Sequence, residues 1–341
     1  MKMTKVAIVI LNWNGKEYLE RFLPSVVEYS DQSYSEIYVA DNHSSDDSID
    51  FIKKNYPEIQ IISFDNNYGF AQGYVKALAQ IKSEYYVLLN SDVEVTNQWL
   101  SIIELMDKDM SIAAVMPKIR SYSNKNYFEY AGAAGGFIDK YGYPFCRGRI
   151  LNMIEKDNGQ YNDLTEIFWA SGACLFLRSK AYFEVGGLDK DFFAHMEEID
   201  LCWRLKKSGY KIVYCPEATV YHVGGGTLPN NTRRKLYLNY RNNLFLLYKN
   251  LPDDNFYLII ITRLFLDILS AFVYLFSLSF SFFAAVIMAH FSYYFSIRTL
   301  KKKRKEINRN TKVYMPNHIY KSSIIYDFFF RKKRYFNQLN F

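Results

Sequence analysis

The sequence is poor in cysteine, and the few cysteines that it has form no motif. Four occur among 341 residues, at Cys146, Cys174, Cys202 and Cys215. No two stand close together and no C-x-x-C occurs, which excludes a zinc ribbon and a dithiol redox motif. We therefore expect four reduced thiols in the core of a cytosolic domain.

Two further absences concern the beginning of the chain. The apolar run at 6–11 is too short for a signal peptide, and polar Asn12-Trp13-Asn14-Gly15 follows it at once. This turn also lacks the G-x-G-x-x-G pattern, which argues against a nicotinamide dehydrogenase. We expect the catalytic part of the protein to stay on the cytoplasmic side of the cell membrane.

The sequence is rich in aromatic residues and in clustered positive charge. It contains 30 Tyr and 27 Phe, with many of them in its last third, and has a net charge of +7. The basic runs at 301–305 and 331–334 suit anionic lipid headgroups or nucleic acid. Because an apolar segment adjoins the first run, we favour lipid and expect no nucleic-acid partner.

Short apolar runs alternate with helical patterns along the first quarter of the chain. The predicted strands are 6–11, 37–40, 59–64 and 85–89, and the predicted helices are 16–29, 46–55 and 70–81. This alternation predicts an α/β fold whose central sheet is mainly parallel and built from βαβ units. Each strand ends in polar residues, and ligands bind at the carboxyl ends of strands in such folds.

The second half of the chain begins with an irregular region. Residues 122–161 show no clear helix or strand period, which suggests a long insertion or an irregular region that faces an acceptor substrate. Strands are predicted again at 173–178 and 211–214, and helices at 179–185, 199–208 and 233–249. Glycine or proline follows each of these helices, as expected of helix ends.

Asp41 closes the second predicted strand. Its carboxylate is a candidate acceptor for the ring N–H of uracil or thymine, since ligands meet at this edge of the sheet. A turn of Asp, Asn and Ser residues that caps the helix near Asp46 explains the same residues without a ligand.

Asn90-Ser91-Asp92 follows the buried strand at 85–89. The Asp92 carboxylate is a candidate ligand for a Mg²⁺ or Mn²⁺ that bridges the two phosphates of a nucleotide-diphosphate ligand. Mg²⁺ typically takes one or two carboxylates plus phosphate oxygens. His222, at a strand end before Gly224-Gly225-Gly226, would complete such a site. An ordinary polar turn and a structural histidine are the alternatives.

Glu197, Glu198 and Asp200 stand among aromatic residues at the start of a predicted helix. Partial burial would raise the pKa of a carboxyl there towards that of a useful general base. Alternatively, acidic residues simply favour a helix N-terminus, with Asp200 and Arg204 as an i,i+4 pair on the helix surface. We prefer the structural role for Asp200 and catalysis for Glu198. Trp169 is either a platform for a sugar face or a core residue.

Taken in order along the chain, these segments resemble glycosyltransferase family 2, the inverting enzymes with a GT-A fold, and its rhamnosyltransferase-like members in particular. The likeness covers about 6–252. The matching segments are Asn12-Trp13-Asn14-Gly15, Asp41-Asn42, Asn67-Tyr68-Gly69-Phe70-Ala71-Gln72-Gly73, Asn90-Ser91-Asp92, Ser171-Gly172-Ala173-Cys174, Glu197-Glu198-Ile199-Asp200 through Arg204, and His222. No single segment is specific, but their order is.

The resemblance implies a nucleotide-sugar site with assigned roles. Asp41 would hold the pyrimidine, while Asp92 and His222 would hold the divalent metal, Mg²⁺ or Mn²⁺. Glu198 would deprotonate the acceptor hydroxyl, with Glu197 as the alternative base because Glu198 stands where the family commonly has Asp. The other implied contacts are Asn12, Asn14, Asn67, Gly69, Asn90 and Ser91 to the donor, and Trp169, Ser171 and Gly172 to the acceptor or sugar.

The last part of the chain predicts an appendage. Residues 256–297 are mostly apolar and aromatic, and 268–289 alone suffices for one membrane crossing of about 20 residues. Because the catalytic domain and the basic run both favour the cytosolic side, we prefer in-plane helices or a shallow hairpin over two spans or a soluble helical pair. The predicted domains are a catalytic domain at 1–252, a hydrophobic helical segment at 253–300 and a basic, aromatic tail at 301–341.

The sequence therefore predicts a metal-dependent, inverting glycosyltransferase at the inner surface of the membrane. Its donor would be a UDP- or dTDP-sugar such as rhamnose, and its acceptor a glycan or a lipid-linked sugar of cell-envelope polysaccharide synthesis. The alternative is a noncatalytic relative that binds a nucleotide sugar or glycan, because Asn90 replaces the Asp that usually opens the family's metal motif. Tyr74 also stands where Asn is common.

Overall fold

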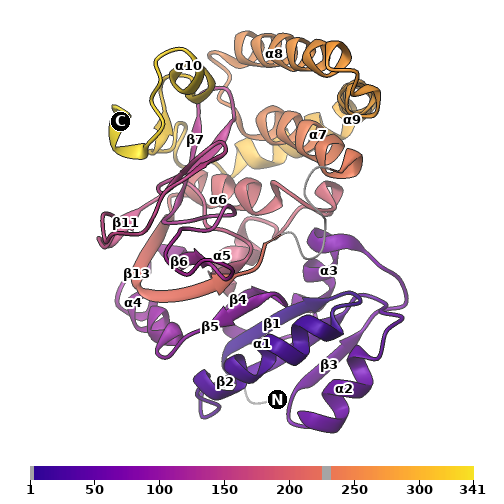
Figure 1. Cartoon of the computed structure of the whole chain (residues 1–341), viewed down its shortest axis with the longest axis vertical. Helices are drawn as coiled ribbons and strands as arrows, with labels where there is room; N and C mark the ends of the chain where they lie inside the picture. Colours follow the sequence, from indigo (N-terminus) through magenta and orange to yellow (C-terminus); the bar gives the residue numbers. More distant parts are fainter. Residues whose placement is uncertain (1–3, 225–231) are drawn as a thin grey trace.

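The computed structural model describes residues 4–224 and 232–341. Among them, nine strands form one sheet in the order β11-β13-β6-β12-β4-β1-β2-β3, with β5 beside β13. Figure 1 shows most of this sheet in indigo and magenta, with β13 in salmon-orange, below the orange helices α7, α8 and α9. The strands are β1 (Thr4–Asn12), β2 (Ser35–Asp41), β3 (Gln60–Ser63), β4 (Ser83–Asn90), β5 (Val93–Val95), β6 (Ile112–Ser121), β11 (Thr165–Glu166), β12 (Cys174–Arg178) and β13 (Lys211–His222).

Helices connect β1, β2, β3 and β4 in the predicted βαβ order, but β12 is antiparallel to both of its neighbours, β4 and β6, so the whole sheet is mixed and not mainly parallel. The helix predicted at 16–29 has the same bounds in the structure, whereas α6 begins two residues before its predicted start at 199. The α-helices are α1 (Lys16–Tyr29), α2 (Ser48–Asn55), α3 (Gly69–Leu78), α4 (Ile102–Lys108), α5 (Ser179–Glu184), α6 (Glu197–Lys207), α7 (Arg233–Asn250), α8 (Phe256–Phe276), α9 (Phe280–Arg309) and α10 (Ile324–Phe329). Single 3-10 turns are η1 (Trp99–Ser101), η2 (Lys190–Phe192) and η3 (Phe336–Gln338).

β1 lies in the interior of the sheet and is parallel to both of its neighbours, β2 and β4. Its apolar residues from Val6 to Ile10 are buried, as expected of a strand covered on both faces. The parallel register places Asn12 opposite Asp41 and Leu11 opposite Asn90. Polar residues far apart in the sequence therefore meet at one edge of the sheet.

β13 is longer than the sequence predicts, since it continues beyond 214 to His222. The register against β6 shifts between Cys215 and Thr219, at the position of Pro216. Proline cannot donate to a neighbouring strand, so a bulge is a typical place for it. After the bulge the strand pairs with β5, which brings His222 opposite Val93.

The irregular region predicted at 122–161 folds as part of a second sheet. Its strands are too short to leave a period in the sequence. They are β7 (Gly136–Asp139), β8 (Pro144–Cys146), β9 (Arg149–Ile150) and β10 (Met153–Ile154), joined by β14 (Ile319–Tyr320) from the C-terminal region. Phe336 and Phe341 pack against Phe137 of β7. The segment predicted as a separate tail therefore completes this sheet and its core.

The helices α8 and α9 form a hairpin beside α7, and the predicted boundary at 300 falls inside α9 (Figure 1). Both are long and apolar enough to cross a membrane. Two residues of the basic run are engaged within the protein: Lys303 binds Asp189 at 2.5 Å, and Arg304 binds Asp253 at 2.5 Å. Lys303 therefore docks α9 on the catalytic domain, and Arg304 joins α9 to the segment that follows α7.

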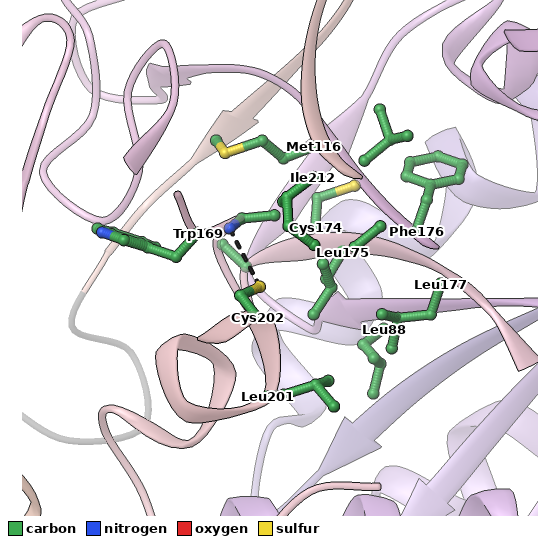
Figure 2. Packing of buried hydrophobic residues seen from close by; sticks show 14 of the residues in the cluster. Leu88, Met116, Trp169, Cys174, Leu175, Phe176, Leu177, Leu201, Cys202 and Ile212 are labelled. Carbon is green, nitrogen blue, oxygen red and sulfur yellow. Dashed lines mark hydrogen bonds between the residues drawn. The ribbon is translucent and has the colours of Figure 1, made fainter. Parts of the chain in front are cut away.

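The main core lies between the sheet and its helices, and part of it is shown in Figure 2. Cys202 of α6 accepts the Ala170 N–H at 3.5 Å beside buried Trp169. All four cysteines are free and buried, as predicted. Burial raises the pKa of the Cys202 thiol to about 12, which keeps it protonated and unreactive.

Candidate active site

The site begins where β1 and β2 end side by side. Asn12 Nδ2 donates to Asp41 Oδ1 and to Ser44 Oγ, each at 3.1 Å. The Ser44 N–H donates to the other carboxylate oxygen of Asp41 at 3.0 Å. Asp41 is thereby held in one orientation by the turn after β2. Because a carboxylate has about four lone-pair sites, this support leaves acceptor capacity for a ligand.

Several residues predicted to contact the donor build the surrounding turns. Asn14 Oδ1 accepts a backbone N–H from the turn after β2 at 2.7 Å. Asn67 Oδ1 accepts the Asn42 amide at 3.0 Å and the Gly69 N–H at 2.9 Å. Gly69 has φ +74°, and a Cβ there would stand 2.6 Å from the Phe193 ring. These turns fix the shape of the site, and direct contact with a donor stays a prediction.

Gly15 lets the turn after β1 come close to two further predicted residues. A Cβ at this position would stand 2.5 Å from Asn12 Oδ1 and 3.6 Å from Ser91 Oγ. A side chain at Gly15 would therefore displace Asn12 from Asp41. The loop after β4, which carries Ser91, lies directly beside the turn after β1.

Three buried side chains form a chain of contacts at the far end of β4. His222 Nε2 lies 3.1 Å from Asp92 Oδ1, and His222 Nδ1 lies 3.1 Å from Glu129 Oε2. Asn90 Nδ2 lies 3.5 Å from the same Nε2. The structure thus brings together Asn90, Asp92 and His222, and it adds Glu129, which the sequence reasoning missed.

The charges of Glu129, His222 and Asp92 stabilise one another. Burial would lower the pKa of His222, but Glu129 and Asp92 raise it to about 10. Burial would raise the pKa of Asp92, but the His222 charge lowers it below its usual value. Without another cation, the imidazole is therefore protonated between two carboxylates.

The same residues fit a divalent metal in a limited way. Within 4–224 and 232–341, no three His, Cys, Asp or Glu side chains converge as a complete ligand set. Asp92 and His222 offer one oxygen and one nitrogen at adjacent positions, which suits a cation that takes its other ligands from phosphate oxygens and water. Glu129 on Nδ1 leaves Nε2 as the nitrogen for the metal.

A strained turn leads into the predicted base. Phe193, His195 and Met196 all have positive φ, between 64° and 71°, which non-glycine residues rarely adopt. Asn242 of α7 donates from Nδ2 to the Ala194 and His195 carbonyl oxygens, both at 2.8 Å. This clamp compensates for the backbone strain, and it sets where α6 starts and where its first carboxylates lie.

Glu197 and Glu198 occupy the first turn of α6. Burial, and next the Glu198 charge, raise the pKa of Glu197 well above its usual value. Burial raises the pKa of Glu198 to about 7. A Cβ built on Gly172 would lie 3.9 Å from Glu198 Cβ and 3.3 Å from the Phe70 ring, so these residues share one wall. A carboxyl that titrates near neutral pH has the property that a general base needs.

The comparisons with known proteins concern the family and the fold. A model described as glycosyl transferase family 2 matches residues 7–186, more than half of the chain. The chain belongs to glycosyl transferase family 2. A second model, described as glycosyl transferase family group 2, matches residues 145–336. The two matches together include every residue of the site described above.

Curated relatives of this glycosyltransferase include two rhamnosyltransferases. It is 26% identical over 234 residues to N-acetylglucosaminyl-diphospho-decaprenol L-rhamnosyltransferase of Mycobacterium tuberculosis, a match that covers 63% of this chain and 75% of the relative. It is 25% identical over 224 residues to Rhamnosyltransferase WbbL of Escherichia coli, covering 64% of this chain and 83% of the relative. The predicted assignment to a rhamnosyltransferase-like group of the family is confirmed.

Solved structures confirm the GT-A-type fold. Mannosyltransferase PcManGT of Pyrobaculum calidifontis, in complex with GDP-Man and Mn²⁺, has a TM-score of 0.52 at 11% identity, covering 91% of this chain and 86% of the other. GalNAc-T7 with UDP, GalNAc and Mn²⁺ has a TM-score of 0.57 at 15% identity, covering 74% and 49%. At these identities the likeness concerns the fold.

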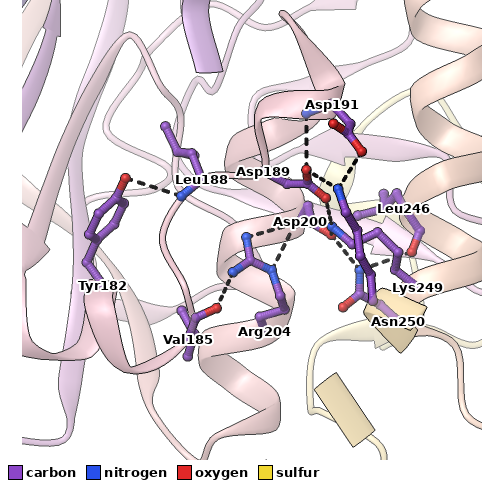
Figure 3. A network of polar contacts seen from close by, with 11 residues as sticks. Tyr182, Val185, Leu188, Asp189, Asp191, Asp200, Arg204, Leu246, Lys249 and Asn250 are labelled. Carbon is purple, nitrogen blue, oxygen red and sulfur yellow. Dashed lines mark hydrogen bonds and ion pairs between the residues drawn. The ribbon is translucent and has the colours of Figure 1, made fainter. Parts of the chain in front are cut away.

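Asp200 of the glycosyltransferase has the structural role that the sequence favours, but it does not lie on the helix surface. It is completely buried and binds Arg204 at 2.8 Å. Lys249 and Asn250 of α7 also bind its carboxylate, each at 2.8 Å. Figure 3 shows these side chains converging on Asp200, so the residue joins α6 to α7.

The three residues predicted to face the acceptor or sugar, Trp169, Ser171 and Gly172, are all buried. Trp169 is 4% exposed, donates from Nε1 to the Phe137 carbonyl oxygen at 2.8 Å and covers Gly136, where a Cβ would come within 2.1 Å of its ring. Ser171 donates its hydroxyl to the Ala131 carbonyl oxygen. A sugar platform at Trp169 does not fit this packing, so the core alternative is correct there.

The sequence reasoning missed two functional candidates of the glycosyltransferase. Glu129 lies in the irregular region, where no period or motif marks it. Asn242 follows Arg241 in the middle of a predicted helix, where asparagine is an unfavourable residue. That unfavourable choice is a usable signal, since a buried helical asparagine requires partners for its amide.

Proposed function

We propose that this glycosyltransferase transfers a sugar from a UDP- or dTDP-sugar, with rhamnose as the first candidate, to a hydroxyl of a glycan or lipid-linked acceptor in cell-envelope polysaccharide synthesis. The observation that carries the proposal is the Glu198 carboxyl, which is held beside Gly172 and whose pKa burial raises to about 7. A group with that pKa is both ionised and basic enough for proton abstraction near neutral pH.

Glu198 is the proposed general base. It takes the proton of the acceptor hydroxyl while the hydroxyl oxygen bonds to the anomeric carbon. The bond from that carbon to the diphosphate oxygen breaks on the opposite face, so the configuration inverts. Glu197, whose pKa is held well above its usual value by burial and by the Glu198 charge, stays protonated beside it. A neutral neighbour lets Glu198 carry the single negative charge of the pair.

Asp92 and His222 are the proposed ligands for Mg²⁺ or Mn²⁺. When bound, the ion supplies positive charge against the negative charge that develops on the leaving diphosphate. The pair offers a hard oxygen and an imidazole nitrogen at the carboxyl edge of the sheet. GalNAc-T7 and PcManGT, which share the fold, both contain Mn²⁺.

Asp41 is the proposed recognition residue for the nucleobase. Uracil and thymine each present one ring N–H, and a fixed carboxylate is a suitable acceptor for it. Asn12 and Ser44 hold the Asp41 carboxylate in place before any ligand arrives. Such preorganisation lowers the entropic cost of binding the donor.

A lipid-linked acceptor is supported by α8 and by the named acceptor of the Mycobacterium relative. Leu258, Ile261, Phe265 and Phe272 are exposed along one face of α8. On its other face, Arg263 binds Asp267 at 2.8 Å and Asn243 Oδ1 of α7 at 2.6 Å. A helix with its apolar face outward and its charges fixed to the protein suits the membrane plane. We therefore place the enzyme peripherally on the cytoplasmic face of the membrane.

A donor screen tests this function. We expect turnover of dTDP-rhamnose or a UDP-sugar that requires Mn²⁺ or Mg²⁺ and stops with a chelator. Glu198→Gln should lower the rate by about 100-fold or more at unchanged donor affinity, since general base catalysis contributes at least that much. Glu197→Gln is the matched control and should retain most of the rate. Donor binding without turnover under any of these conditions would favour the noncatalytic alternative.

A further inference from the structure

A cavity of about 290 Å³ lies between the first turn of α7 and the apolar half of α9. Its lining is unusual because it combines two guanidinium groups with an apolar wall. The lining residues are Arg233, Arg234, Tyr237, Ala285 and Met288. The Tyr237 hydroxyl is within 2.8 Å of Ser292 Oγ, which fixes α7 against α9 beside the cavity. Neither the arginines nor the apolar wall of this cavity takes part in the catalytic steps proposed above.

Both arginines keep their charge available. Arg233 Nη2 contacts Met288 Sδ at 3.0 Å, and the Arg234 guanidinium stands 4.6 Å from the centre of the Phe193 ring. In the described part of the chain, neither has a carboxylate partner, and both are exposed. The sequence from 225 to 231 contains no Asp or Glu. Two adjacent unneutralised guanidinium groups favour an anion with several oxygens, such as a phosphate or diphosphate.

In a second cavity, of about 500 Å³, two of the lining cations are already paired with a carboxylate. It lies between α5, α6 and α9 and is also lined by cations, including Lys249 and Lys303. Both of these lysines bind Asp189, at 2.6 Å and 2.5 Å (Figure 3 shows the Lys249 contact). Their charge is therefore already neutralised within the fold. These two lysines are engaged by a carboxylate, whereas neither arginine of the smaller cavity has a carboxylate partner in the described part of the chain.

The arginine pair lies between the turn that leads into the proposed base and the apolar face of α9. Phe193, under Arg234, belongs to the turn that leads into Glu197 and Glu198. Met288, beside Arg233, opens a stripe of exposed apolar residues on α9 that continues through Phe291 and Phe295, which are 58% and 86% exposed. An anion on the arginines would thus have the proposed base on one side and an apolar helix on the other.

We propose that Arg233 and Arg234 bind the diphosphate that joins the sugar of a lipid-linked acceptor to its polyprenyl chain. The chain lies along Met288 and Phe291 of α9, and the sugar hydroxyl points towards Glu198. This inference rests on the proposed function in so far as the acceptor is lipid-linked, and it names the part of that acceptor which the protein recognises. The site also orients the acceptor, because the charged group sits between its two dissimilar ends.

Binding of farnesyl diphosphate to the full-length protein in detergent tests the site without catalysis. Titration calorimetry should give a dissociation constant that rises about tenfold or more when Arg233→Ala and Arg234→Ala are combined, since charge-assisted contacts are lost. Met288→Gln should also lower the affinity for farnesyl diphosphate, because it places a polar group on the apolar wall of the cavity. The matched control is Arg298→Ala with Lys302→Ala, which removes two exposed cations from α9 and should leave binding unchanged. The affinity for UDP should stay the same in all variants, which shows that they fold.

Three other results would overturn the proposal. Equal binding of farnesyl diphosphate by the wild type and the double arginine variant would exclude these residues. Inorganic pyrophosphate binding as tightly as farnesyl diphosphate would indicate a plain anion site, and equal displacement by phosphatidylglycerol vesicles would indicate a headgroup contact. These outcomes are separate from the proposed function, which fails instead if Glu198→Gln transfers sugar at the wild-type rate.

Discussion

Asn242 and Asn243 are neighbours on α7, yet their side chains hold opposite parts of the molecule. Asn242 donates to the carbonyl oxygens of Ala194 and His195, in the turn before the proposed base. Asn243 accepts from Arg263 of α8 at 2.6 Å. Both side chains are buried, at 0% and 1% exposure. One helix therefore supports the catalytic turn and the hairpin with two adjacent residues of the same type.

This arrangement predicts different kinetic effects for matched substitutions. Asn242→Ala should lower kcat by about 10- to 100-fold with little change in the KM for donor, because a small displacement of a catalytic group is costly. Asn243→Ala should destabilise the protein to a similar degree while leaving kcat near the wild-type value. Steady-state kinetics and thermal unfolding measure both quantities. Equal losses of kcat in the two variants would show that the effect of Asn242 is general destabilisation.

The pH dependence of transfer follows from Glu198. Burial raises the pKa of its carboxyl to about 7, so the active, ionised form is lost as the pH falls through that value. We expect kcat to fall about tenfold per pH unit below pH 6, with an apparent pKa near 7. In Glu197→Gln the acid limb should remain, since burial and not Glu197 is the main cause of the shift. An acid limb that disappears with Glu197 would reverse the roles of the two residues.

Glu129 should tune metal affinity without contacting the metal. It lies 3.1 Å from His222 Nδ1 and orients the ring so that Nε2 faces Asp92. Residues that orient a metal-binding histidine typically contribute about 10- to 100-fold in affinity. Titration of Mn²⁺ in the presence of UDP should show that loss in Glu129→Ala. Glu94→Gln is a suitable control, because the ion-pair partner of Glu94 among the described residues is Lys125, a surface residue. An unchanged Mn²⁺ affinity in Glu129→Ala would contradict this role.

The parts of the site that the sequence predicts share one property, which is that they lie in or next to strands with a clear apolar pattern. Asn12, Asp41 and Asp92 each end or follow such a strand, and parallel pairing brings their backbones to one edge. Glu129 could not be found in this way, since it lies between elements too short to show a period. Its position depends on the fold of the second sheet.

The burial of Asp200 shows a second limit of sequence reasoning. The i,i+4 spacing correctly indicates the pair with Arg204, but spacing on one helix is the same for exposed and buried pairs. What buries the pair is α7, which brings Lys249 and Asn250 over it from a distant part of the sequence. Local pattern predicts the partner, and only tertiary structure gives the environment.

Stability should depend strongly on this buried network. Lys249 binds both Asp189 and Asp200 and is 2% exposed, so Lys249→Met leaves two buried carboxylates short of a cation. Removal of one partner from a buried pair typically costs about 3 to 5 kcal/mol. The control is Lys211→Met, which breaks the exposed pair with Asp109 and should cost at most about 1 kcal/mol. Urea unfolding of both variants measures the difference, and similar midpoints would refute the structural role of the network.

Membrane binding should depend on the outward face of α8. Phe265 is 58% exposed on this face, whereas Phe183 is 53% exposed on α5 and serves as a control of equal chemistry. Insertion of one phenylalanine side chain into an apolar phase is worth about 1.5 to 3 kcal/mol. Phe265→Glu should therefore lower the affinity for phosphatidylglycerol-containing vesicles by about tenfold or more, and Phe183→Glu should leave it unchanged.

Sedimentation of the full-length protein with vesicles measures this binding directly. The comparison also separates two of the three arrangements that the sequence left open, in-plane helices and two membrane spans. A helix that lies in the membrane plane is anchored by its outward face alone, so single charges on that face release the protein reversibly. Two transmembrane spans would instead keep both variants in the vesicle fraction after a high-salt or carbonate wash. Arg263 and Asp267 are bound to each other on the inward face of α8, so the outward, apolar face is the one that meets lipid. We therefore expect a high-salt or carbonate wash to release Phe265→Glu from the vesicles.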